Sequence, residues 1–140
     1  MQPYTPKDFS YLLGIDGMSD TLLTNHFTLY QGYVTNTNKL IDQMKAMEPG
    51  TPEYAELHRR FGWEWNGMRL HELYFGNIAK HAVGLSDRAL KPKIIATWGS
   101  LENWEKEFRA MCAMRGIGWV VLAHDKGTGS LFNVWVDEHN

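Results

Sequence analysis

The sequence predicts an α+β fold, in which an antiparallel helical hairpin is followed by a further helix and a small antiparallel sheet. Three observations predict it. Two long stretches carry apolar residues at helical spacing, and Glu48-Pro49-Gly50 separates them. A third stretch with the same spacing follows Ser100. Near the C-terminus, two short apolar runs flank a glycine-rich turn, which is the pattern of a β-hairpin.

The first two helices are expected to form the hairpin. The first should run from Thr21 to Met47, with Ser19 or Asp20 as its N-cap. Thr51 should cap the second, which runs from Pro52 to about Ile78, because proline is tolerated in a first turn. Two glycines inside this second stretch are candidate points for a bend or interruption. Long helices joined by a short turn lie antiparallel.

The second half of the chain is expected to be a separate part. A looser segment, Val83–Lys93, marks the boundary between a helical-hairpin domain, residues 1–82, and an incomplete α/β domain, residues 83–140. After this segment, Ser100 caps the third helix. The sole cysteine, Cys112, lies in the apolar stripe of that helix and is expected to be buried.

Two strands complete the prediction. Trp119–Ala123 and Leu131–Val136 are apolar runs, and the turn between them contains two glycines. A two-stranded hairpin is only marginally stable by itself. We therefore expect that a stable sheet needs a third strand, and the sequence does not obviously contain one.

Composition excludes several classes of function. The formal net charge is −2 and no run of basic residues occurs, so a nucleic-acid partner is not expected. No segment approaches the roughly 18 apolar residues of a membrane span. A single cysteine allows no intrachain disulfide and is typical of a reducing compartment. With no leader of signal-peptide type at the N-terminus, we expect a cytoplasmic protein.

Two of the six histidines are candidates for a metal site. His26 lies early in the first helix and His71 late in the second, so an antiparallel hairpin can bring them face to face. Neutral imidazole suits iron, manganese and zinc. The plainer alternative is that both are hydrogen-bonded core residues. Three others are expected to be solvated: His58, His81 and His124.

Three stretches resemble, in order, the iron/manganese superoxide dismutase family. The stretch from His26 to Leu40 resembles the first ligand helix of that family. Trp65–Phe75 resembles the second ligand helix, in which two aromatic residues follow the ligand histidine. The stretch from Gly99 to Trp119 is similar to the family's glycine-serine helix start and glycine-tryptophan strand. Together the matches cover most of the chain.

The resemblance implies a fold and a reaction. The fold is a helical hairpin followed by an α/β domain with a three-stranded antiparallel sheet. The reaction is the disproportionation of superoxide to dioxygen and hydrogen peroxide by one iron or manganese ion, which alternates between its divalent and trivalent states. Superoxide is then the small-molecule partner, and a homo-oligomer, dimer or tetramer, is expected. The resemblance does not decide between iron and manganese.

The resemblance also implies roles for single residues. His26 and His71 would be metal ligands, Tyr33 the gateway tyrosine of the substrate funnel, and Trp119 a residue lining the pocket. His139 falls where the family usually has a glutamine, or in some members a histidine, that is hydrogen-bonded to metal-bound solvent. A donor at that position tunes both the pKa of the bound solvent and the redox potential.

Two departures from the family pattern concern the first ligand helix. His26 and Tyr33 are seven positions apart, one fewer than is usual in the family. Leu29 and Tyr30 replace a pair of histidines. Either this helix lacks a local bulge, or Tyr30 takes over part of the role of those histidines beside the cofactor.

The family's other two protein ligands, an Asp and a His, belong to an Asp-x-x-Glu-His-x-Tyr-type motif that does not occur here. We therefore expect a C-terminally truncated fragment, with the activity residing in the longer protein. One alternative is a non-catalytic helical interaction module, which predicts imidazoles that point apart or are blocked by neighbouring side chains. Another is a zinc-binding or metal-storage protein that uses His26, His71 and His139.

Overall fold

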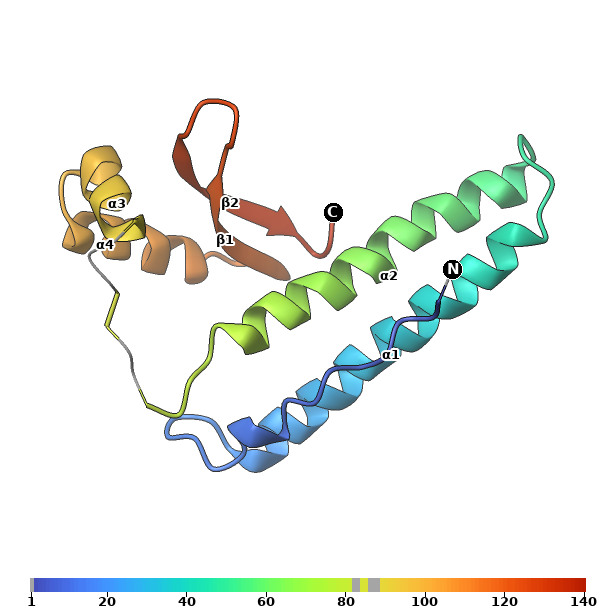
Figure 1. The fold of residues 1–140 in the computed structure, drawn as a ribbon, viewed down its shortest axis with the longest axis horizontal. Helices are drawn as coiled ribbons and strands as arrows, with labels where there is room; N and C mark the ends of the chain where they lie inside the picture. The colour runs from blue at the N-terminus through green and yellow to red at the C-terminus, as the bar shows by residue number, and fades with distance from the viewer. Residues whose placement is uncertain (1, 82–83, 86–88) are drawn as a thin grey trace. The chain divides into compact units, whose positions relative to one another are not determined.

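The computed structural model describes residues 2–81, 84–85 and 89–140. It confirms the α+β class, because helices precede a two-stranded antiparallel sheet (Figure 1). The elements are η1 (Ser10–Leu12), α1 (Asp20–Lys45), α2 (Pro52–Gly76), α3 (Leu90–Trp98), α4 (Leu101–Cys112), β1 (Gly118–His124) and β2 (Leu131–Asp137). Two compact units result: Met1–Ala82 with His139–Asn140, and Val83–Glu138. None of the described helices has the length and apolar character needed to cross a membrane.

The ends of the hairpin helices follow from their caps. The hydroxyl of Ser19 accepts a hydrogen bond from the Leu22 N–H at 3.1 Å, so Ser19 is the N-cap of α1. Thr51 does the same for α2 through the Tyr54 N–H at 3.2 Å. The expected interruption of α2 at its glycines is wrong, because the helix is continuous from Pro52 to Gly76.

Helices α1 and α2 lie side by side, and the N-terminal segment runs along α1 (Figure 1). Backbone N–H and C=O of Tyr4 bond the side chain of Asn38 at 2.8 and 2.9 Å, which fixes this segment. Seven buried side chains form the core of the unit: Phe9, Leu12, Leu23, Tyr30, Val34, Met68 and Phe75. Burial of each large apolar side chain contributes about 1.5–3 kcal/mol.

The second unit contains a helix that the sequence pattern did not predict. Residues 82–83 and 86–88 of the expected loose segment lie outside the described residues, but α3 already begins at Leu90, so the expectation is wrong for residues 90–93. Pro92 occupies the first turn of α3, where its missing N–H costs no hydrogen bond. Ile94, one turn after Leu90, is fully buried and anchors the helix.

The third predicted helix and both strands are present. Ser100 caps α4 by accepting a hydrogen bond from the Asn103 N–H at 3.1 Å. Strands β1 and β2 pair antiparallel from Gly118↔Asp137 to His124↔Leu131. The sheet has two strands within the described residues. Cys112 is exposed, which corrects the expectation of a buried thiol: it ends α4, a helix with no fully buried residue.

Candidate metal centre

The imidazoles of His26 and His71 lie close together, one from each helix of the hairpin. Their ring centroids are 4.9 Å apart and the rings are nearly perpendicular. Two imidazoles that bind one ion at about 2.0–2.1 Å, with an angle between a right angle and the tetrahedral value, have ring centroids roughly 4.5–5.2 Å apart. The observed spacing therefore fits two ligands of one ion.

His71 is held in a definite tautomer. Its Nδ1 lies 2.6 Å from the carbonyl oxygen of Gly67, one turn earlier in α2. A carbonyl only accepts hydrogen bonds, so Nδ1 carries the proton, and Nε2 is the unprotonated nitrogen of the neutral ring. Histidines that bind metals commonly donate their other ring N–H in this way, which fixes the orientation of the ring.

Both imidazoles are neutral at physiological pH. Burial lowers the pKa of His26 below its ordinary value. Burial also lowers the pKa of His71, and the proximity of His26 and His139 adds to this, so that the pKa is about 4 although the bond to the Gly67 carbonyl opposes the shift. Metal binding requires the neutral form of histidine. The pair is therefore in the binding form without the loss of a proton.

A tyrosine and a histidine form a hydrogen-bonded pair beside these rings. The Tyr33 hydroxyl and His139 Nε2 lie 2.8 Å apart, and the Tyr33 ring centroid is 5.1 Å from that of His71. His139 is buried, with the Trp63 ring edge-on to it at 5.2 Å. The Asn66 amide donates a hydrogen bond to the His139 carbonyl at 2.7 Å. These contacts fix His139 on the helical hairpin.

Gly67 is the point of closest approach between the hairpin helices at this site. A Cβ placed on Gly67 would lie 2.7 Å from Cδ1 and 2.8 Å from Cε1 of Tyr33. Only glycine therefore lets the Tyr33 ring lie against α2. The same residue supplies the carbonyl that orients His71.

Tyr30 forms another wall of the site. Its ring is 1% exposed and is stacked on His71, with a centroid distance of 6.4 Å. Its hydroxyl accepts a hydrogen bond from the Lys7 N–H at 3.0 Å and donates one to Glu72 at 3.1 Å. Burial raises the pKa of Tyr30, and the neighbouring Glu72 carboxylate adds to the effect.

Glu72 also lies beside this site, although the sequence pattern did not single it out. Its side chain is 7% exposed and lies against the side chains of Lys7 and Arg69, with N···O distances of 2.9 and 2.7 Å. Burial alone would raise the pKa of Glu72, but hydrogen bonds from Lys7, Arg69 and Tyr30 outweigh it and hold the pKa below the ordinary value. The sequence feature that could have identified Glu72 is a carboxylate directly after a candidate ligand, within a largely apolar face of the helix.

The remaining sequence candidates lie elsewhere. Trp119 is half-buried in β1 of the second unit, and its role in lining a pocket stays a prediction. Three histidines are exposed, as expected: His58, His81 and His124.

The paired-ligand interpretation and its two alternatives concern the same three histidines. The non-catalytic alternative predicts imidazoles that point apart or are blocked by neighbouring side chains. The two ring centroids are 4.9 Å apart, and the rings of Tyr74 and Phe75 lie 5.3 and 5.0 Å from that of His26. The three-histidine alternative adds His139, whose ring centroid lies 6.0 Å from that of His71 and whose Nε2 bonds the Tyr33 hydroxyl. Within the part of the chain that the structure describes, no group of three or more potential ligand side chains is close enough to hold a metal.

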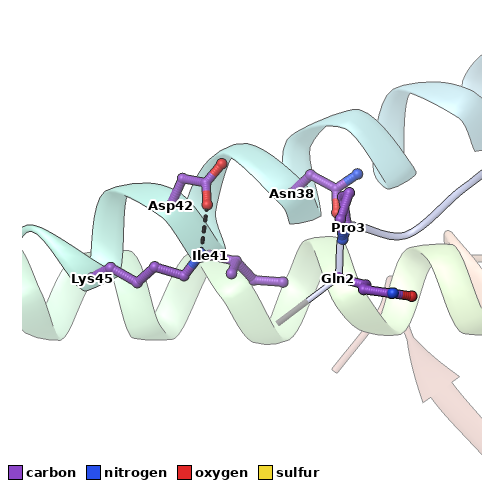
Figure 2. Close-up of a pocket in the computed structure, with 6 residues that line it drawn as sticks. All are labelled: Gln2, Pro3, Asn38, Ile41, Asp42 and Lys45. Atoms are coloured by element: carbon purple, nitrogen blue, oxygen red, sulfur yellow. Dashed lines mark hydrogen bonds and ion pairs between the residues drawn. The ribbon is translucent and has the colours of Figure 1, made fainter.

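A separate pocket is lined by the N-terminal segment and by α1. Figure 2 shows the six residues that line it: Gln2, Pro3, Asn38, Ile41, Asp42 and Lys45. An ion pair between Lys45 and Asp42, 2.8 Å long, crosses one end. The lining contains no histidine and begins about three helical turns after His26 on α1, so it is not part of the candidate metal centre.

Sequence comparisons with known proteins cover nearly the whole chain. A sequence profile of the C-terminal domain of iron/manganese superoxide dismutases matches residues 86–140. The iron superoxide dismutase of Aquifex aeolicus is 35% identical over 96% of this chain and 67% of its own length. Manganese superoxide dismutase 1 of Halobacterium salinarum is 32% identical over 99% of the chain and 69% of its own length. The chain thus spans about two thirds of the length of these relatives.

Proposed function

The chain belongs to the iron/manganese superoxide dismutase family, and we propose that the protein converts superoxide to dioxygen and hydrogen peroxide at one iron or manganese ion. The observation that supports this proposal best is the pair of neutral imidazoles, His26 and His71, which lie close together with ring centroids 4.9 Å apart. The relatives are named as iron or as manganese enzymes, so the choice of metal stays open.

In this proposal the bound ion supplies one-electron redox chemistry, and the chain supplies the surroundings. His26 and His71 hold the ion, and the Gly67 carbonyl keeps the ligand nitrogen of His71 unprotonated. Tyr33 and His139 hold a proton between the tyrosine oxygen and His139 Nε2. That proton lies next to the ligand pair, where reduced superoxide must gain protons to become hydrogen peroxide.

Two aromatic residues have supporting roles in the proposal. Tyr30 stacks on His71 and excludes water from one side of that ring, which strengthens electrostatic interactions at the ion. Trp119 lines the substrate pocket, as the resemblance implies. No membrane or nucleic-acid partner is required, and we further propose a cytoplasmic homo-oligomer.

The test compares two histidines of the same helical unit in the natural protein loaded with iron or manganese. His71→Ala removes a proposed ligand, whereas His58→Ala removes an exposed histidine of the same helix. We expect His71→Ala to abolish both bound metal, measured by plasma mass spectrometry, and superoxide turnover, measured by pulse radiolysis. We expect His58→Ala to keep both. Turnover by the wild-type protein no faster than that of the free ion would refute the proposal.

A further inference from the structure

We propose that Glu72 is a positioning residue of the metal centre, which holds the Tyr30 ring against His71 through a hydrogen bond with the Tyr30 hydroxyl. The inference rests on the proposed function and adds to it a residue that touches neither substrate nor ion. Glu72 acts through Tyr30, and Lys7 and Arg69 keep its carboxylate in place.

The Glu72 carboxylate is the centre of a network that joins three parts of the unit. Its Oε1 accepts the Tyr30 hydroxyl of α1 at 3.1 Å. Its Oε2 contacts the Lys7 ammonium of the N-terminal segment at 2.9 Å and the Arg69 guanidinium of α2 at 2.7 Å. A buried charge that lacks partners is costly, so this carboxylate stays where its three donors meet.

The position of Tyr30 is fixed from both sides by this network. Its hydroxyl also accepts the backbone N–H of Lys7 at 3.0 Å, so the N-terminal segment covers the oxygen that Glu72 binds from α2. The ring then has one orientation, which is close to parallel with His71 at 29°. We expect movement of the hydroxyl away from Glu72 to tilt this ring and weaken its contact with the imidazole.

A second ion pair on the same helix, between Glu56 and Arg59, offers an exposed carboxylate for comparison with Glu72. Glu56 pairs with Arg59 three residues later, as Glu72 pairs with Arg69 three residues earlier. The Glu56 side chain is 61% exposed, and among the described residues no tyrosine hydroxyl bonds it, whereas the Glu72 side chain is 7% exposed. Glu56 therefore provides a control of matched chemistry without a link to the histidines.

The experiment compares Glu72→Met, Glu72→Gln and the control Glu56→Met in the full protein. The first removes the acceptor of the Tyr30 hydroxyl, and the second keeps an uncharged acceptor oxygen. Affinity for Mn²⁺ is measured from the electron paramagnetic resonance signal of the free ion. In the metal-free protein, the nuclear Overhauser effect between the Tyr30 and His71 rings reports their contact.

We expect Glu72→Met to weaken Mn²⁺ binding by about 10-fold, as for loss of a group that orients a ligand, and to reduce the Tyr30–His71 effect. Glu72→Gln should restore most of both, and Glu56→Met should change neither. A purely structural role would lower the melting temperature while leaving both readouts of the folded protein unchanged. Equal readouts for Glu72→Met and Glu56→Met would therefore overturn the inference.

Two further outcomes distinguish a failure of the inference about Glu72 from a failure of the proposed function. If the wild-type protein binds no Mn²⁺, the proposed function fails, and the ring contact in the metal-free protein still decides whether Glu72 positions Tyr30. If Glu72→Met does not fold, Tyr30→Phe removes only the hydroxyl at the other end of the same bond. An unchanged His71 ring contact and Mn²⁺ affinity in Tyr30→Phe would overturn the inference.

Discussion

Substitution of Gly67 by alanine should destabilise the protein, although the same change in most exposed helices is stabilising. Alanine is favoured over glycine in a helix interior by about 0.8–1.0 kcal/mol. At Gly67 the added Cβ would lie 2.7 Å from a carbon of the Tyr33 ring, far inside van der Waals contact. The sign of the effect therefore depends on whether Tyr33 can move.

Tyr33 has little freedom to move. Its hydroxyl bonds His139 Nε2 at 2.8 Å and its ring packs on His71 at 5.1 Å, so a shift costs one hydrogen bond and one aromatic contact. Insertion of a methyl group into such a packed position costs about 1–3 kcal/mol. After subtraction of the helix-propensity gain, Gly67→Ala should lie between nearly neutral and about 2 kcal/mol less stable than the wild type.

Gly62 is the matched control, since it lies in the same helix and a Cβ there meets nothing within 4 Å. Gly62→Ala should raise the free energy of unfolding by about 0.5–1 kcal/mol. Urea denaturation followed by far-ultraviolet circular dichroism measures both variants. The two should differ by about 1–3 kcal/mol. If Gly67→Ala stabilises the protein as much as Gly62→Ala does, the close approach of Tyr33 to α2 is wrong.

Three further changes test the fold. Phe75→Ala should lower the free energy of unfolding by about 3–5 kcal/mol, because the Phe75 side chain is fully buried. Leu73 is 60% exposed, so Leu73→Ala should change that free energy by less than about 0.5 kcal/mol. Urea denaturation measures both. Ser19→Ala removes the N-cap of α1 and should cost about 1 kcal/mol, with Ser19→Asp close to the wild type in the same assay. Gly118→Ala should disrupt the pairing of β1 with β2, because its Cβ would lie 2.3 Å from the Val136 carbonyl oxygen. Hydrogen exchange should show that the amides of both strands lose protection while those of α1 keep it. Unchanged protection in the strands would contradict the prediction.

The elements that depend on local chemistry could be predicted from the sequence. Ser19, Thr51 and Ser100 each cap a helix, as their position before an apolar stretch indicated. The error at α3 has a physical cause: Pro92 is unfavourable inside a helix but harmless in its first turn, and the pattern alone did not fix where that turn begins.

The candidate site could be predicted only in part. The helical positions of His26 and His71 made a facing pair plausible, and the family resemblance suggested Tyr33 and His139. Glu72 was not found, since its partner Lys7 is distant in sequence and its burial follows from tertiary packing rather than from spacing.

The contact between Tyr33 and His139 joins residues 106 positions apart, and this separation bears on how the protein is made. The His26–His71 pair needs only the first two helices, and α2 ends at Gly76, 63 residues before His139. At a synthesis rate of about 5–20 residues per second, those 63 residues take roughly 3–13 s. Helices form within about a microsecond. The two imidazoles of the proposed ligand pair are therefore synthesised several seconds before the histidine that bonds Tyr33.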